Sequence, residues 1–586
     1  MATLFDTFSP SGHPRGLRVL MPLIPFIAIL LFLTGCGGST VSSVRPDFDA
    51  SAAMPAPAPV PAPMAASSPK MTESTGAYRM PPMVAAMAPA PPPDSNFAPT
   101  AYSGLEYNTE EYDRIVDNPF LKAMDNPVST FSIDVDTASY ANLRRFLVES
   151  REMPPKDAVR IEEMLNYFTY SYPAPTSEHP VAAYFSMTQA PWAPDHWLLR
   201  VALKTKEIET AQLPASNLVF LLDTSGSMMD ENKLPLLKDS LKILIEKLRP
   251  EDRVSIVAYA GTTGLILDST SAAHKETIIN AFTQLEASGS TAGGAGIQLA
   301  YDVAKRNYIT GGNNRVILCT DGDFNVGVSS SSELERLIEE KRKDNIYLTV
   351  IGVGMGNYKD SRMETLADKG NGNYAYIDNL LEGKKVLGKE IWGNLFAVAK
   401  DVKIQIEFNP AMVREYRLIG YENRILARED FNDDTKDAGE MGSGQTVTAF
   451  YELIPQSAPA QTGTATTPPP SEPLVFQQAS LVDSTDVLAF RLRYKEPDDG
   501  QEESKLISLR LNTETLYRKP GAIDEDFRFA SAVVQLGMLL RDSPYKGTAT
   551  YQAAMDLARM AKGPDLEGYR AEFVRLVELA ELLDQP

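Results

Sequence analysis

The chain contains very little cysteine and histidine. Its 586 residues include two cysteines, Cys36 and Cys319, which cannot form a disulfide framework or a four-ligand zinc site. The histidines show no metal-ligand spacing from one another, which disfavours zinc hydrolases and histidine-based triads. The four are His13, His179, His196 and His274.

Positive charge is also scarce. Lys and Arg total 56 against 77 Asp and Glu, so the formal net charge is -21, and no large basic patch offsets it. Binding to phosphate backbones requires a high density of Lys and Arg, so nucleic acid is not an expected partner. A chain of this length exceeds one compact domain, and several domains are expected.

The N-terminus contains a short apolar segment rather than a long one. Arg15 and Arg18 precede an apolar run over 19–33, and Leu33-Thr34-Gly35-Cys36 follows it. The run is interrupted by Pro22 and Pro25 and is shorter than the ~20 apolar residues that span a bilayer. Positive charge, a short apolar core and small residues before a cysteine resemble a bacterial lipoprotein signal.

That resemblance implies removal of residues 1–35 and a lipid on the thiol of Cys36. The chain would then be exported and anchored in the cell envelope. Gly37 follows the cysteine where an inner-membrane retention signal would place Asp, which favours the outer membrane if the cell has two. An uncleaved transmembrane anchor is the alternative.

Residues 36–100 are rich in Pro and Ala and contain few bulky apolar residues. Such a segment cannot offset the entropy of ordering, so we expect an extended tether. Beyond it, patterns of hydrophobicity divide the chain into a mixed N-terminal region (101–215), an alternating strand and helix region (216–399), a β region (400–520) and C-terminal helices (521–586). Ala458–Pro473 is a low-complexity loop.

The region 216–399 predicts an α/β domain. Four of its predicted strands are nearly continuous apolar runs, as expected for parallel strands that are covered on both faces. Helical patterns separate them, so we expect a doubly wound, mostly parallel sheet with its ligand site at the carboxyl ends of the strands. The predicted strands are Leu218–Leu222, Val254–Tyr259, Val316–Cys319, Ile346–Val353 and a weaker Tyr374–Ile377, and the helices are 234–248, 274–285, 294–308, 333–343 and 380–392.

Residues that alternate like strands lie on both sides of this α/β domain. They occur at 181–187 and 197–204 before it, and at 402–408, 446–453, 487–494 and 506–511 after it. We expect these strands to form one β-sandwich with the α/β domain inserted between them. The helix at 380–392 would then link the α/β domain to that sandwich.

Three loops of the α/β domain carry hard oxygen ligands. Asp223-Thr224-Ser225-Gly226-Ser227 follows the first strand, Thr291 lies in the Gly-rich loop 288–294, and Asp321 follows the strand Val316–Cys319. Carboxylate and hydroxyl oxygens without nearby His or Cys suit a hard divalent cation. The sequence therefore predicts a metal site at Asp223, Ser225, Ser227, Thr291 and Asp321.

This D-x-S-x-S, Thr and Asp set resembles the metal-ion-dependent adhesion site of the von Willebrand factor type A (VWA) family. The resemblance implies that Ser225, Ser227 and Thr291 ligate the metal directly, while Asp223 and Asp321 ligate it or hold its waters. An Asp or Glu of a protein partner would fill the open coordination position. The resemblance also implies that movement of the last helix, at 380–392, is coupled to ligation of the metal and reports occupancy to the sandwich. Mg²⁺ suits such a site, and Mn²⁺ or Ca²⁺ are alternatives. With its lipid signal and tether, the chain resembles an envelope lipoprotein branch of the family and is expected not to be an enzyme.

Other interpretations remain open at this point. The metal could be purely structural in a scaffold protein, or it could assist a hydrolase, although a nucleophile–base pair is not evident. Asp223, Ser225 and Ser227 could only cap a helix. The acidic pair in Asp134-Val135-Asp136-Thr137 fits a turn or helix cap, with a second metal as the alternative. Cys319 is expected to pack as a small apolar residue.

Overall fold

The computed structural model describes residues 110–260, 263–289, 293–322, 331–456, 484–497 and 503–585. All of them belong to the second of two compact units, Ala101–Pro586, the first being Met1–Thr100. The predicted signal with Cys36, the tether, Thr291 and the loop Ala458–Pro473 lie outside the described residues.

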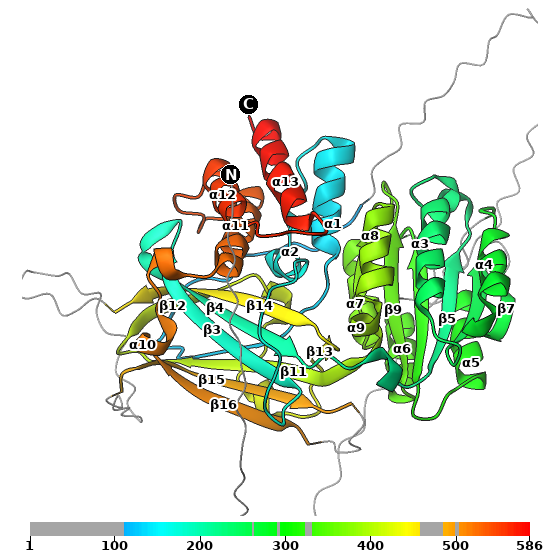
Figure 1. The fold of residues 1–586 in the computed structure, drawn as a ribbon, viewed down its shortest axis with the longest axis horizontal. Helices are drawn as coiled ribbons and strands as arrows, with labels where there is room; N and C mark the ends of the chain where they lie inside the picture. The colour runs from blue at the N-terminus through cyan, green and yellow to red at the C-terminus, as the bar shows by residue number, and fades with distance from the viewer. Residues whose placement is uncertain are drawn as a thin grey trace, which may run out of the picture. The chain divides into compact units, whose positions relative to one another are not determined.

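The α/β domain is built on a six-stranded sheet (Figure 1). All neighbours in it are parallel except β7, which pairs antiparallel with β6 at the edge. The five predicted strands are confirmed. The order is β10 (Tyr374–Ile377), β9 (Ile346–Val353), β8 (Asn313–Thr320), β5 (Ser216–Asp223), β6 (Arg253–Tyr259) and β7 (Thr263–Ser271).

Both faces of this sheet are covered by helices, which explains the continuous apolar run of its central strand (Figure 1). Leu218, Phe220 and Leu222 of β5 pack with helices α3 (Leu234–Lys247) and α4 (Lys275–Thr283). The intervening Val219 and Leu221 pack on the opposite side, with α5 (Gly293–Arg306), α6 (Ser331–Lys343) and α7 (Asp360–Lys369). The predicted doubly wound architecture is therefore confirmed.

The last helix of this domain differs from the prediction of one helix over 380–392. The structure has α8 (Leu380–Lys384), a π-helical turn (Lys385–Lys389) and α9 (Ile391–Leu395). Gly383 allows α8 to pack closely on α3. A Cβ at this position would lie 2.2 Å from Ser240 Oγ. Periodicity alone does not reveal such interruptions.

Two further sheets form the β-sandwich and share one hydrophobic core. β4 pairs with β14, so strands from before and after the α/β domain lie in one sheet. The first sheet has the order β1 (Leu121–Lys122), β12 (Val413–Ile419), β14 (Thr446–Pro455), β4 (Ala193–Thr205), β3 (Val181–Ala190). The second has the order β13 (Gly439–Gly442), β11 (Ala397–Phe408), β15 (Asp486–Lys495), β16 (Lys505–Asn512), with β2 (Val128–Ser132) also paired to β11.

The two chain segments that connect the α/β domain to the sandwich lie side by side. The Thr205 hydroxyl, at the end of β4, donates to the Gly442 carbonyl oxygen at 2.6 Å. Ala397, at the start of β11, pairs with Gly442 as well. The two connections therefore meet at the same turn, which is the arrangement of a domain inserted into a loop.

A helical cluster packs on the sandwich and combines helices that precede β3 with helices that follow β16 (Figure 1). Its core includes Tyr140, Leu165, Phe529 and Phe573. The helices are α1 (Ala138–Arg145, continued by a π-helical turn to Ser150), α2 (Ile161–Asn166), α11 (Glu525–Leu540), α12 (Tyr551–Met560) and α13 (Tyr569–Leu583); the short α10 (Thr513–Leu516) follows β16.

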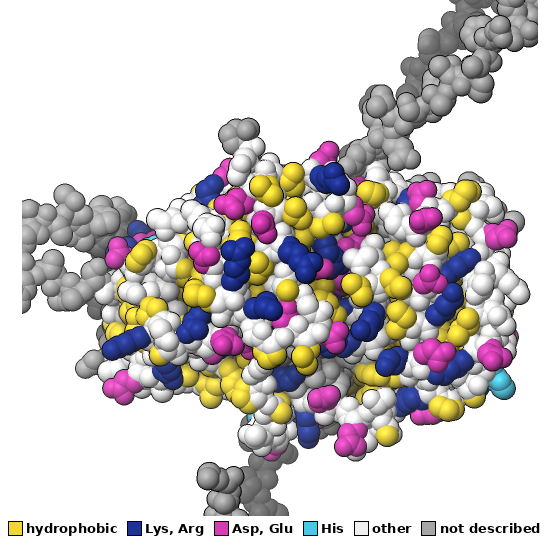
Figure 2. All heavy atoms as spheres, turned by 45° about the horizontal axis from the view of Figure 1, so that its top comes forward, with side chains coloured by type: hydrophobic (Ala, Val, Ile, Leu, Met, Phe, Trp, Pro, Cys, Tyr) yellow, Lys and Arg dark blue, Asp and Glu magenta, His cyan; other side chains and the backbone are white. Residues whose placement is uncertain are grey.

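Charged side chains of both signs are mixed over the face drawn in Figure 2. Interspersed charge of this kind is typical of a solvated surface. Among the described helices, none has the length and apolar character needed to cross a membrane.

Candidate metal centre

The loop after β5 brings two predicted hydroxyls together. The backbone N–H of Ser225 donates to Asp223 Oδ1 at 2.9 Å, which closes a tight turn at the end of the strand. Ser225 Oγ and Ser227 Oγ then lie 3.0 Å apart. Ser225 is buried and Ser227 is exposed, so the hydroxyl pair lies where the domain interior meets its surface.

Asp223 is fully buried and held by the neighbouring strands. Its Oδ2 accepts hydrogen bonds from the Tyr259 hydroxyl at 3.0 Å and from Thr320 Oγ1 at 3.3 Å. Burial, together with the charge of Asp321, raises the pKa of Asp223 to about 6, against the hydrogen bonds from Ser225 and Tyr259. Two carboxyl groups therefore interact at this edge of the sheet, where a cation would stabilise both.

Asp321 follows β8 directly and is also fully buried. Its Oδ2 accepts hydrogen bonds from Lys233 Nζ at 3.1 Å and from Asn357 Nδ2 at 3.2 Å. Gly322 then turns the chain with φ +100°, and a Cβ there would lie 2.5 Å from the backbone nitrogen of Lys359. The Asp-Gly pair is thus required by the close approach of the loop that follows β9.

The third loop is described only on either side of Thr291, which itself lies outside the described residues. The backbone N–H of Gly226 donates to the Gly289 carbonyl oxygen at 3.0 Å, and that of Ser288 donates to the Thr224 carbonyl oxygen at 2.7 Å. The Gly-rich loop is therefore attached to the hydroxyl-bearing loop two residues before Thr291.

The described side chains fit a hard divalent cation. They offer carboxylate and hydroxyl oxygens, without nitrogen or sulfur ligands among them, at one edge of a parallel sheet. Asp223, Ser225, Ser227 and Asp321 would hold the ion, with Thr291 as the predicted fifth ligand. Ser225 precedes a single 3₁₀ turn and makes no side-chain capping hydrogen bond, so helix capping does not explain its position.

Four residues that were not predicted as part of the site contact its carboxylates: Tyr259, Thr320, Lys233 and Asn357. The first two end the strands beside β5, and the strand pattern could have found them. Nothing in the sequence indicates that Lys233 or Asn357 would reach Asp321.

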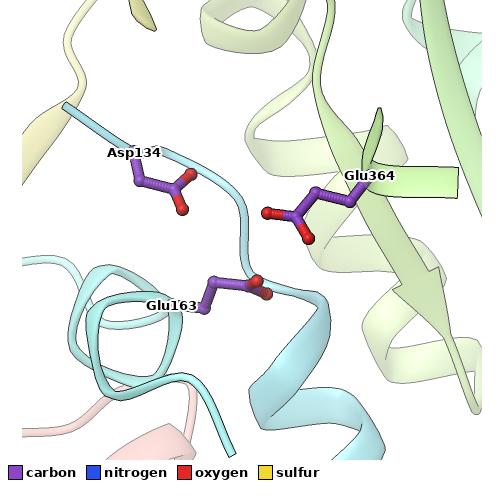
Figure 3. Close-up of side chains that lie close together, drawn as sticks. All are labelled: Asp134, Glu163 and Glu364. Carbon is purple, nitrogen blue, oxygen red and sulfur yellow. The ribbon is translucent and has the colours of Figure 1, made fainter. Parts of the chain in front are cut away.

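A second group of carboxylates lies away from this edge. Asp134, Glu163 and Glu364 each offer an oxygen within 4.8 Å of the others. Figure 3 shows the three side chains converging from the loop before α1, from α2 and from α7. Guanidinium groups already pair with them, however. Arg160 lies 3.1 Å from Glu163 and 2.7 Å from Glu364, and Arg424 lies 3.3 Å from Asp134. The group is part of an ion-pair cluster that joins the α/β domain to its flanks.

The acidic pair of the loop before α1 takes part in this cluster. Asp134 Oδ1 accepts the Asp136 backbone N–H at 3.0 Å, so the predicted turn is present. Of the two predicted roles, a turn or a helix cap, the structure has the turn, while Thr137 occupies the N-cap position of α1 without a side-chain hydrogen bond. Asp136 Oδ1 instead accepts the Tyr374 backbone N–H at 2.8 Å, which ties this loop to β10.

Cys319 is fully buried in β8, as predicted for a small apolar residue. Burial raises the pKa of its thiol, which opposes formation of a reactive thiolate.

Three family profiles match the chain. The von Willebrand factor type A domain matches residues 217–385, which contain every predicted metal ligand. A further profile described as von Willebrand factor matches residues 106–200, and one described as the C-terminal part of the uncharacterized protein YfbK matches residues 393–583.

The uncharacterized protein YfbK of Escherichia coli (strain K12) is 44% identical over 482 residues, which is 81% of this chain and 81% of that protein. The chain belongs to the YfbK family. The uncharacterized protein sll0103 of Synechocystis is 28% identical over 186 residues, 31% of this chain and 42% of that one. Among solved structures, a von Willebrand factor type A protein from Catenulispora acidiphila covers 68% of this YfbK-family chain and 90% of its own, at 15% identity and a TM-score of 0.39.

Proposed function

We propose that this YfbK-family protein binds a carboxylate of a protein partner through a divalent cation at the edge of its VWA domain. The observation that carries the proposal is the hydroxyl pair of Ser225 and Ser227, 3.0 Å apart and directly after the buried Asp223. Where neutral hydroxyls ligate the cation directly and Asp223 and Asp321 hold its waters, the charge of the ion is compensated only at a distance, so a bound ion attracts a further anion. Mg²⁺ is the proposed ion, because it binds oxygen ligands and keeps exchangeable waters.

The same proposal assigns the site to binding rather than catalysis. The hydroxyls of Tyr259 and Thr320 donate to Asp223 and hold it in place. Two of the histidines lie in the sandwich, His179 beside the Tyr494 hydroxyl and His196 beside the Glu452 carboxylate. The imidazoles of His179 and His196 are therefore occupied away from the hydroxyl pair, where a general base would have to lie.

The proposed setting is the cell envelope. A lipid on Cys36 would anchor the protein, and the Pro- and Ala-rich segment over 36–100 would hold the folded part away from the membrane. If the cell has two membranes, we propose the outer one. A partner with an exposed Asp or Glu would then be captured at the envelope.

Capture of partners from envelope extract tests this function. The immobilised protein should retain a partner in Mg²⁺ and release it in EDTA, and Ser225→Ala should retain none. Ser240→Ala is the matched control, because its buried hydroxyl has no hydrogen-bond partner among the described residues. Equal capture by wild type and Ser225→Ala, with and without EDTA, would refute the function.

A scaffold with a purely structural metal is the second candidate, and the buried ion-pair cluster between the VWA domain and its flanks favours it. In that case EDTA should lower the midpoint of thermal unfolding and leave partner capture unchanged.

A further inference from the structure

Lys233 is a lysine that the fold buries beside the proposed metal site. Its side chain is 6% exposed, and its ammonium lies 3.1 Å from Oδ2 of the fully buried Asp321. It directly precedes α3, and its stem lies against Gly354 after β9. A Cβ at Gly354 would lie 2.5 Å from Lys233 Cε, so the glycine leaves the space that the stem occupies.

Burial of an ammonium group is costly unless a carboxylate compensates it. Asp321 supplies that charge, and a second carboxylate, that of Asp230, lies 3.9 Å from Nζ and is 70% exposed. Lys233 therefore has one buried partner, Asp321, inside the site and one exposed partner, Asp230, at the protein surface.

The inner partner is also a proposed metal ligand. Asp223 and Asp321 together would present two negative charges to a cation, and Lys233 reduces this net charge to one. A divalent ion that binds Asp321 would lie close to the ammonium of Lys233, which already contacts this carboxylate. The two positive charges would repel each other at such short range.

We propose that Lys233 is a built-in cation that competes with the divalent ion for Asp321. Without a metal it neutralises Asp321 and keeps the edge of the sheet intact. When a divalent ion binds, the ammonium turns toward Asp230 and the surface. The competition lowers the affinity of the site, so the metal is held firmly only when a partner carboxylate adds a further ligand. This inference rests on the proposed function and adds its regulation.

Titration calorimetry of Mn²⁺ into the purified protein tests the competition. Lys233→Met keeps the apolar stem and removes the charge, and we expect it to lower the Kd for Mn²⁺ roughly tenfold or more. Lys233→Gln keeps an N–H donor for Asp321 without the charge and should tighten binding similarly. The matched control is Lys242→Met in α3. The ammonium of Lys242 pairs with the exposed Asp239 at 2.8 Å, and this variant should bind Mn²⁺ like wild type.

Thermal unfolding gives a readout without metal. In EDTA, Lys233→Met should melt below wild type because Asp321 loses its counter-charge, and Mn²⁺ should raise its midpoint by more than that of wild type. Equal or weaker Mn²⁺ binding by both Lys233 variants, with wild type binding normally, would overturn the role of Lys233 alone. Failure of wild type and all variants to bind any divalent ion would instead overturn the metal site itself, and the competition with it.

Discussion

Glu162 is a buried carboxyl group whose charge is poorly compensated. Its Oε2 has no hydrogen-bond partner among the described residues, and Gly420 with φ +76° packs directly against it. Burial, together with the charges of Glu422 and Asp134, raises the pKa of Glu162 to about 8. The folded protein therefore holds a proton here at pH values at which the unfolded chain has released it.

This raised pKa predicts a pH dependence of stability. Above the unfolded value near 4.5, folding takes up a proton, so the contribution of Glu162 to stability is present at low pH and is lost as pH rises toward about 8. Glu162→Gln should raise the midpoint of thermal unfolding at pH 8 by a few degrees and change it less at pH 5. Calorimetric scans of both proteins between these values measure this; parallel pH profiles would contradict it.

At the scale of single elements, the sequence predicts the strands that are buried on both faces. The run Leu218–Leu222 identifies β5 because every one of its side chains enters a core. The edge strand β7 was missed, because its side chains are half-exposed or exposed and its pattern is polar. A strand can thus be predicted from the sequence where burial on both faces restricts each of its residues to apolar types.

Helix α7 was missed for a different reason. It carries Asp360, Glu364 and Asp368, one turn apart, and such spacing is typical of a solvated face. Here two of the carboxylates pair with Arg160, which precedes α2, and two with Arg424, in the loop after β12. The positions of Asp223 and Asp321 could be predicted because each residue ends or directly follows a buried strand, whereas ion pairs between distant segments leave no local pattern.

Arg424 should hold α7 in place. It pairs with Glu364 and Asp368 of α7 and with Asp134 and Asp136 of the loop before α1. Arg424→Met leaves buried carboxylates uncompensated, a change that costs about 3–5 kcal/mol in comparable cases. We expect roughly tenfold or faster hydrogen exchange of the α7 amides, with β5 unchanged.

The control for this experiment is Arg428→Met, four residues further along and exposed. It should leave exchange in α7 at the wild-type rate. Unchanged exchange in Arg424→Met would show that apolar packing of Met363 and Leu366 is enough to hold the helix.

At the scale of the whole molecule, Arg144 links three parts of the described chain. From α1 it contacts Asp378 and Glu382 of the VWA domain at 2.5 and 2.7 Å, and Glu572 of α13 at 2.9 Å. The expected coupling of metal occupancy to the sandwich has two routes of contact from this end of the VWA domain. Glu382 of α8 contacts the helical cluster through Arg144, and Asn394 of α9 accepts a hydrogen bond from Gln445, next to β13 of the sandwich, at 3.0 Å.

The predicted anchor gives a test of location. Cys36→Ser removes the thiol that would carry the lipid, so the protein should leave the membrane fraction and appear in the soluble envelope fraction. Mass spectrometry of the wild-type N-terminal peptide should show a chain that begins at Cys36 with added acyl mass. An unmodified Cys36 within an intact N-terminus would contradict the lipoprotein prediction.

The proposed metal site of the VWA domain consists of Asp223, Ser225, Ser227, Thr291 and Asp321. Titration calorimetry of Mg²⁺, Mn²⁺ and Ca²⁺ into wild type, Ser225→Ala and Ser240→Ala measures whether it binds a divalent cation. We expect saturable binding at one site in wild type and Ser240→Ala, and loss of this binding in Ser225→Ala. Binding that survives in Ser225→Ala, or a folded wild type that binds none of the three ions, would refute the site.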